Sequence, residues 1–322
     1  MNEPETLDTE TGDTLSTPEH ADVSQVQSAR VIDAPGQPRV RCVLGEGATW
    51  SAARGELLWT DIPSRVLWAL NPRTQRVRQW TLGSRLGCFA LTAEAHVLLA
   101  AFEHHLAWLD LNTGQTTPLV EFDKGLATRA NDGRCDRAGN FVFGTFDERR
   151  DAAPAGSWYR YTPAGELQRL PLPAVFIPNG LAFDLAGTRM YFCDSVEGVI
   201  RQAAYDPATG ALGAQHVFAQ VPEGEPDGAT IDADDHYWSA HWGAGHVQRY
   251  APDGIAQACV VVAASQPSCM AFGGDDLSTL FITSAQLGLS DTALAAQPDA
   301  GAVFAMQQAM RGVAESVFGG TP

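Results

Sequence analysis

The chain has 322 residues, with 21 basic and 38 acidic side chains, a formal charge of −17 and 45% hydrophobic residues. This hydrophobic share is enough for a sizeable folded core. The excess of acidic side chains argues against a nucleic-acid-binding protein, because such a protein needs clustered Lys and Arg to bind phosphates. No stretch approaches the ~20 apolar residues of a membrane-spanning helix, so the sequence predicts neither nucleic acid nor membrane as a partner.

The first part of the chain has the composition of a solvated tail. Residues 1–40 hold eight acidic against two basic side chains and are rich in Thr, Ser and Pro. The apolar surface that so few residues can bury does not offset the conformational entropy lost when a chain becomes ordered. We therefore expect residues 1–38 to form a disordered acidic tail before a folded domain at 39–322. The absence of a signal-peptide pattern and the six dispersed cysteines favour a cytoplasmic location.

From residue 42 onward, short apolar runs of strand length alternate with turn clusters. In chain order the runs are 57–62, 66–70, 97–102, 106–111, 141–145, 190–193, 237–240 and 280–283. Up to residue 285 no helical period is sustained, so helices should be rare. We expect the stretch AVFAMQ, within 301–313, to be the last strand, and residues 39–44 to pair with it.

Similar phrases precede the strands at a regular spacing. Taking one point in each phrase, they recur every 42–48 residues, at Glu46, Cys88, Asn131, Asn179, Asp227 and Cys269. This is the length of a four-stranded propeller blade, and six points imply six blades. The sequence therefore predicts an all-β fold, a six-bladed β-propeller with four-stranded antiparallel blades. Because the first strand of each blade lines the central channel, the six points should converge on one axis.

The residues at these points suggest a metal site. Four of them carry side-chain oxygens, at Glu46, Asn131, Asn179 and Asp227. Carboxylate and amide oxygens suit a hard cation such as Ca²⁺, Mg²⁺ or Mn²⁺, while Zn²⁺ or Fe²⁺ with water ligands also fits. Asn-Gly and Asp-Gly are also ordinary turn dipeptides, as in Pro252-Asp253-Gly254 after a strand. The shared phase of the four favours one common site.

Longer strings at the same phase resemble the gluconolactonase and regucalcin family. The similarity extends over residues 40–310, and the strings occur in the family's order: LGEGATW followed by TDI, RANDGRCDRAGNFVFGT, IPNGLAFDLAGTRMYFCDS, EPDGATIDADDHYWSAHWGAGHVQRYAPDG and QPSCMAFGGDDLSTLFITSA. The resemblance implies a six-bladed propeller that binds one divalent cation and hydrolyses sugar lactones.

The resemblance also implies residue roles. The family's metal ligands fall on Glu46, Asn179 and Asp227, and Asp227 matches the position proposed as proton donor and acceptor. Arg129 and Asn131 match positions that contact substrate. One position departs, because Arg149 stands where some animal members carry a substrate-holding Glu. We therefore expect the far end of the substrate to be recognised differently, with the neighbouring residues Asp147, Glu148 and Arg150 as candidates.

The leading hypothesis is a metal-dependent sugar lactonase in which Asp227 is the general base for a metal-activated water. Two alternatives remain open: a phosphotriesterase or aryl-ester hydrolase on the same cation, and a calcium-binding regulatory propeller without turnover. The sequence does not select the sugar or the metal, and it leaves the oligomeric state open between a monomer and a weak dimer. No nucleophile elbow, P-loop or dinucleotide fingerprint supports another enzyme class.

Overall fold

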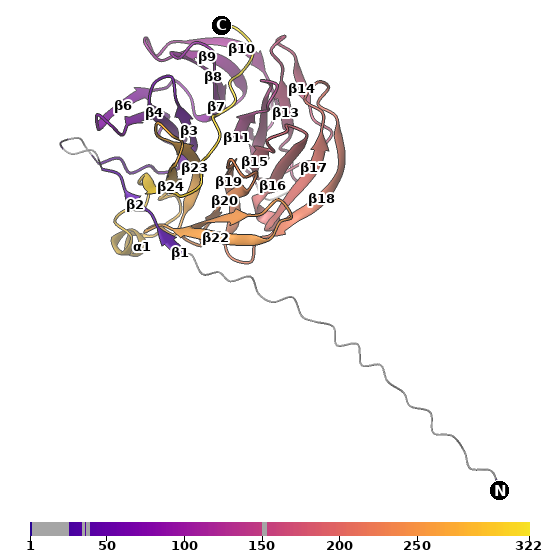
Figure 1. The fold of residues 1–322 in the computed structure, drawn as a ribbon. Coiled ribbons are helices and arrows are strands. Elements are labelled where there is room, and N and C mark those ends of the chain that lie inside the picture. Colours follow the sequence, from indigo (N-terminus) through magenta and orange to yellow (C-terminus); the bar gives the residue numbers. More distant parts are fainter. Residues whose placement is uncertain (2–25, 34–35, 37–38, 150–152) are drawn as a thin grey trace.

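Six antiparallel β-sheets stand around a central axis in the computed structural model, which describes residues 1, 26–33, 36, 39–149 and 153–322 (Figure 1). The first strands of the blades are β3 (Gly45–Ser51), β7 (Leu86–Leu91), β11 (Thr128–Cys135), β15 (Pro178–Phe183), β19 (Glu225–Ile231) and β23 (Pro267–Gly273). Each contacts the first strand of the next blade, and β23 returns to β3. The predicted six-bladed propeller is confirmed.

The remaining strands follow outward in sequence order. The second strands are β4 (Glu56–Asp61), β8 (Val97–Phe102), β12 (Phe141–Asp147), β16 (Arg189–Asp194), β20 (Tyr237–Trp242) and β24 (Thr279–Ser284). The third strands are β5 (Val66–Asn71), β9 (His105–Asp110), β13 (Trp158–Tyr161), β17 (Val199–Tyr205), β21 (His246–Tyr250) and β25 (Phe304–Gln307). The outer strands of blades one to five are β6 (Arg76–Thr81), β10 (Thr116–Glu121), β14 (Leu167–Arg169), β18 (Leu212–Gln220) and β22 (Ala256–Val261).

Helix is rare in the described residues, as predicted. It comprises the short helix α1 (Asp291–Ala296) and the 3₁₀ turn η1 (Ser195–Glu197). Neither has the length and apolarity that crossing a lipid bilayer requires. All six cysteines, which lie in described parts of the chain, are free.

Ring closure differs from the prediction. The last strand β25 lies in the expected stretch, but its outer partner is β2 (Arg30–Val31), and β1 (Val26–Ser28) adds a parallel fifth strand to blade five. Residues 39–44 form no closing strand: Arg41 instead binds Asp299 at 2.8 Å, and Leu44 forms only an isolated bridge. The expected tail therefore includes two strands, too short for composition to reveal. Of that tail, residues 2–25 lie outside the described residues.

The core is divided among the contacts between neighbouring blades. Six main clusters of buried apolar side chains occupy the six blade–blade interfaces. Trp50 stacks on Phe281 between blades one and six at 5.6 Å between ring centroids, and Trp238 meets Phe272 between blades five and six. Each large side chain buried in this way stabilises the ring by about 1.5–3 kcal/mol. Because every sheet is held on both faces, the first strands present fixed positions to the axis.

Candidate functional site

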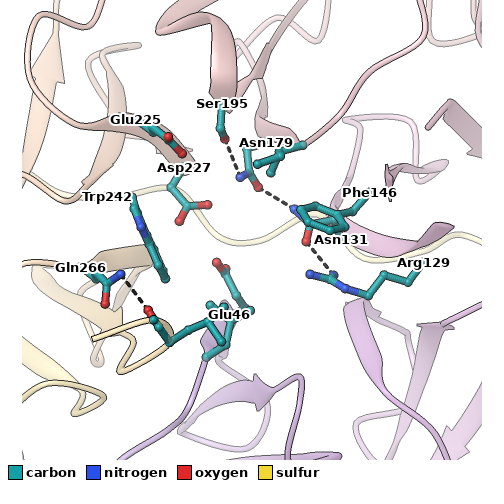
Figure 2. A pocket seen from close by; sticks show the side chains of 14 residues that line it. Glu46, Arg129, Asn131, Phe146, Asn179, Ser195, Glu225, Asp227, Trp242 and Gln266 are labelled. Atoms are coloured by element: carbon teal, nitrogen blue, oxygen red, sulfur yellow. Dashed lines mark hydrogen bonds between the residues drawn. The ribbon is translucent and has the colours of Figure 1, made fainter. Parts of the chain in front are cut away.

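A cavity of about 310 Å³ opens at one end of the channel, where the first strands begin (Figure 2). Blades one, three, four and five and the chain around blade six supply its walls. All five site residues predicted from sequence line this cavity: Glu46, Arg129, Asn131, Asn179 and Asp227. Figure 2 shows Glu46 and Asp227 facing each other across its centre, with Asn179 and Asn131 beside them. Four of the six repeat points therefore converge on the cavity, whereas Cys88 and Cys269 are absent from its walls.

A local irregularity in the first strands accompanies this convergence. Each of the six strands shifts register against its second strand near its beginning, for example between Asn179 and Ala182 and between Pro226 and Ala229. Such a bulge bends the strand and turns side chains away from the regular alternation. The polar points therefore lie inside the first strands, whereas the spacing of the phrases predicts them before these strands.

Glycine is required beside Asn179. Gly180 has a φ of +68°, and a Cβ there would lie 2.8 Å from the Tyr237 hydroxyl oxygen and 2.9 Å from the Cys193 sulfur. A side chain at this position would meet both a left-handed backbone and two buried atoms. The Asn-Gly pair thus allows the bulge, and the bulge brings Asn179 to the cavity.

Two carboxyl groups share the centre of the cavity and have few hydrogen bonds to stabilise their charged forms. The Glu46 carboxylate accepts a hydrogen bond from the Gly47 N–H at 3.2 Å. Asp227 is 5% exposed, and its Oδ1 is buried without a hydrogen-bond partner among the described residues. Burial first, and then the charge of Asp132, raise the pKa of Glu46. Burial, Glu46 and Asp132 together raise the pKa of Asp227 well above its usual range.

These raised pKa values indicate what the site needs. Two buried carboxylates that repel each other are stabilised in their charged form by a cation between them. In the described part of the chain no group of three or more His, Cys, Asp or Glu side chains is arranged to hold a metal ion. The donor set here is instead two carboxylates with amide oxygens. This set, with the unpartnered oxygen of Asp227, fits a hard divalent cation.

A chain of hydrogen bonds fixes the side-chain amides of Asn131 and Asn179. Asn131 Nδ2 donates to Asn179 Oδ1 at 3.0 Å and to the Pro178 carbonyl at 2.9 Å. Asn179 Nδ2 donates to Ser195 Oγ at 2.9 Å, and that hydroxyl donates to the Pro226 carbonyl at 2.7 Å. These bonds fix the Asn179 amide so that its oxygen keeps a second lone pair for a ligand.

Arg129 forms the cationic wall of the cavity. It is 7% exposed, and its Nη1 donates to Asn131 Oδ1 at 2.7 Å. Its guanidinium lies 4.5 Å from the centre of the Phe146 ring, and its Nε is 3.7 Å from a carboxylate oxygen of Glu148. Burial is the main cause that lowers the pKa of Arg129, to about 10, so the group remains charged near neutral pH.

Comparison with known proteins agrees with this geometry. Residues 44–286 match the SMP-30/Gluconolactonase/LRE-like region. The chain belongs to the SMP-30/gluconolactonase/LRE-like family. An L-arabinolactonase of Azospirillum brasilense is 43% identical over 285 residues, covering 88% of this chain and 94% of the relative. A 6-deoxy-6-sulfogluconolactonase of Pseudomonas putida is 34% identical, covering 86% of this chain and 96% of the relative.

A solved structure shows the same likeness. The calcium-binding protein regucalcin from Agrobacterium tumefaciens superposes with a TM-score of 0.84 at 31% identity, and the match covers 92% of this chain and 99% of that one. The resemblance proposed from sequence is confirmed at the level of the SMP-30/gluconolactonase family and its fold.

Within this family, the chain's departure at Arg149 has a structural counterpart. Arg149 is not among the residues that line the cavity, and it pairs with buried Asp147 through Nε–Oδ1 and Nη2–Oδ2 contacts of 3.1 Å each. This pairing is the main cause that lowers the pKa of Asp147. Glu148 bridges Arg129 and Arg85, at 2.6 Å from the latter. Arg150, the third candidate, lies outside the described residues.

The cavity of this SMP-30 family chain is also lined by residues to which no role is assigned from the sequence. They are Leu44, Phe146, Ile177, Ser195, Glu225, Gln266, Leu287 and Gly288. Trp242 also lines the cavity, whereas the preceding residue, His241, is absent from its walls and contacts Tyr250. Leu44, Ile177, Glu225 and Gln266 each begin one of the resembling strings, and Ser195 ends one. Phe146, Leu287 and Gly288 lie just beyond these strings, so no pattern in the sequence marks them.

Proposed function

We propose that this chain is a metal-dependent hydrolase of sugar lactones, which opens an aldonolactone to the aldonic acid. The names of its lactonase relatives support this reaction class. The observation that carries the proposal is the buried pair of Glu46 and Asp227, with an Asp227 oxygen that lacks a partner, at the centre of the cavity. A scaffold that binds no cation would gain nothing from two uncompensated carboxylates.

We assign the cation to Glu46, Asn179 and Asp227. When bound there, a divalent cation would supply Lewis-acid polarisation of the lactone carbonyl and would lower the pKa of a water molecule. The two carboxylates balance its charge, and the neutral amide of Asn179 preserves its electrophilic character. Ser195 orients that amide through its hydrogen bond at 2.9 Å.

The chain's own residues then account for the proton transfers. Asp227 takes a proton from the attacking water as the oxygen adds to the carbonyl carbon. The ring C–O bond breaks when the tetrahedral adduct collapses, and Asp227 returns the proton to the departing ring oxygen. Arg129 and Asn131 bind the lactone on the adjoining wall and keep its carbonyl near the two carboxylates. One water is consumed and one carboxylic acid is formed.

Replacing the general base gives a direct test of this assignment. Asp227→Asn should lower kcat for pentono- and hexonolactones about 100-fold or more, because general-base catalysis contributes at least that much. Acid release above the spontaneous rate measures the turnover. Asp253→Asn is the matched control, since Asp253 lies in an identical Pro-Asp-Gly tripeptide in an exposed turn.

The alternatives predict other outcomes of the same assay. If the unchanged protein hydrolyses phosphotriesters or aryl esters but no lactone, the esterase alternative is favoured. If it hydrolyses none of these substrates, the calcium-binding regulatory propeller is favoured. If Asp227→Asn hydrolyses lactones at the parent rate, the assignment of the base is wrong.

A further inference from the structure

The three residues assigned to the cation share a feature of the backbone beside them. Each follows a residue whose main-chain carbonyl accepts a hydrogen bond from a side chain of the preceding blade. These bonds run from Asn131 to the Pro178 carbonyl before Asn179 (2.9 Å), from Ser195 to the Pro226 carbonyl before Asp227 (2.7 Å), and from Ser268 to the Gly45 carbonyl before Glu46. Asn131 and Ser195 line the cavity, whereas Ser268 is absent from its walls.

A first strand lacks hydrogen-bond donors on one side, because it forms the inner edge of its sheet. Carbonyl groups on that side have no neighbouring strand, and a buried carbonyl without a donor destabilises the fold. A side chain from the preceding blade satisfies such a carbonyl and also fixes the backbone at that point. The beginning of β3 is therefore held by blade six as well as by its partner strand β4.

Ser268 is held in one orientation by its own partners. The residue lies near the beginning of β23 and is 0% exposed. The Gly45 carbonyl can only accept, so the Ser268 hydroxyl donates to it, and the Thr283 hydroxyl is the donor in the 3.0 Å contact between the two side chains. The Thr283 oxygen in turn accepts the Cys269 N–H at 3.1 Å. The Ser268 hydroxyl is thereby directed at blade one.

The position of the Glu46 carboxylate depends on the backbone that Ser268 holds. This carboxylate accepts a hydrogen bond from the N–H of the next residue, Gly47, at 3.2 Å, a contact within β3 that ties it to no other blade. It faces Asp227 of blade five across the cavity (Figure 2). A shift of β3 at Gly45 therefore changes the separation of the two carboxylates, and a cation bound by both requires a fixed separation.

We propose that Ser268 is a positioning residue, which sets the place of the Glu46 carboxylate through the Gly45 carbonyl. It serves Glu46 as Ser195 serves Asp227, from the preceding blade in each case. A cation then binds to carboxylates that are already in place, so less of the binding free energy is lost in ordering the site. This inference rests on the proposed cation-dependent function and adds to that site a residue outside the cavity.

Cation binding by Ser268→Ala tests this role without any lactone. Titration calorimetry of the chelator-treated full-length chain with Ca²⁺, Mn²⁺ and Zn²⁺ in turn gives the dissociation constants. For the cation that binds the unchanged protein most tightly, Ser268→Ala should raise the dissociation constant about five- to tenfold, the effect of one hydrogen bond. The double variant with Glu46→Ala should bind no more weakly than Glu46→Ala alone, because Ser268 acts through that carboxylate.

Ser284→Ala is the matched control. Ser284 is also 0% exposed and lies in blade six, and its hydroxyl donates to the Ala302 carbonyl at 2.8 Å. Both variants should lower the urea midpoint to a similar extent, since each leaves one buried carbonyl without its donor. Only Ser268→Ala should bind the cation more weakly. A residue that merely joins two blades would change the midpoint and leave the dissociation constant at the parent value.

Ser268→Cys keeps the test decisive if Ser268→Ala does not fold. The thiol occupies the same position but is a weak donor, so the cation should again bind more weakly than in the unchanged protein. Parent affinity in a folded variant of Ser268, or further weakening of Glu46→Ala by Ser268→Ala, would overturn this inference and leave the cation assignment intact. If the unchanged protein binds none of the three cations, the assignment and this inference fail together.

Discussion

Two identical tripeptides show that position in the fold decides what a residue can do. Asp227 and Asp253 each lie in a Pro-Asp-Gly sequence. Asp227 is buried in β19 with one oxygen unpartnered, whereas Asp253 is exposed and its Oδ1 accepts the Ile255 N–H at 3.1 Å, an ordinary turn contact. Composition alone does not separate them. Their different phase in the 42–48-residue repeat does.

His241 carries a prediction about pH and stability. It is 2% exposed, and its Nε2 lies at hydrogen-bonding distance, 3.1 Å, from the Tyr250 hydroxyl oxygen. Burial, followed by the charge of His246, lowers its pKa to about 3. Between pH 3 and ~6.5, His241 is protonated in the unfolded chain but neutral in the folded protein. The free energy of unfolding should therefore fall as pH is lowered through this window, by up to about 1.4 kcal/mol per unit from this residue.

Urea unfolding at several pH values measures this contribution. The stability of His241→Gln should depend less steeply on pH than that of the parent in this window. His216→Gln, a change at an exposed histidine, should keep the parent slope. Equal slopes for His241→Gln and the parent would show that the buried imidazole does not carry the effect.

The difference between residue type and position in the fold also limits how much of the site could be predicted from the sequence. Glu46, Asn179 and Asp227 were found because they repeat at one phase. Leu287 and Gly288 have no such signal, because they lie beyond the last of the resembling strings. Contacts between loops of different blades are set by tertiary structure, which periodicity does not encode.

At the scale of the element, the bulge in the first strand directs a polar side chain of the blade toward the cavity, where it can bind a ligand. A regular strand alternates its side chains between two faces, so it would bury some polar points between blades. All six first strands carry the register shift, yet only some bear polar side chains at it. Blades two and six place Cys88 and Cys269 in the apolar clusters instead.

Gly180→Ala tests this role of the bulge. The alanine would occupy a left-handed backbone and press on Tyr237 and Cys193, so we expect a loss of about 1–3 kcal/mol in the free energy of unfolding and weaker cation binding through Asn179. Denaturant unfolding and calorimetry measure the two effects. Gly125→Ala, with a φ of +80° but no atom near the added Cβ, should cost less and leave cation affinity unchanged. Parent-like stability of Gly180→Ala would contradict this account.

At the scale of the whole molecule, both ends of the described chain join blades together. The segment after β25 runs across the ring in Figure 1 and pairs with several blades: Gly312 with Asp232, and Phe318 with Thr92. Along this path Glu315 binds Arg134 of β11 through both carboxylate oxygens, at 2.6 and 2.7 Å. The number of blades could be predicted from the repeat. These closing contacts could not, because they lie outside it.

Glu315→Ala should therefore destabilise the whole ring. It leaves the guanidinium of Arg134, which is largely shielded from solvent, without its carboxylate, and breaking a buried pair costs about 3–5 kcal/mol. Glu197→Ala removes the more exposed pair with Arg201 and should cost less than about 1 kcal/mol. Chemical denaturation of both variants gives the comparison. Equal losses would mean that the C-terminal segment does not secure the ring.

The central claim is that Glu46, Asn179 and Asp227 hold the cation that lactone hydrolysis requires. The most direct measurement is lactone turnover by chelator-treated protein during titration with Ca²⁺, Zn²⁺, Mg²⁺, Mn²⁺ or Fe²⁺, with Glu46→Gln in parallel. We predict that turnover is lost on chelation, returns as about one equivalent of a suitable cation binds, and requires a higher cation concentration in Glu46→Gln. Full turnover by the metal-free protein, or identical titrations of the two proteins, would contradict the claim.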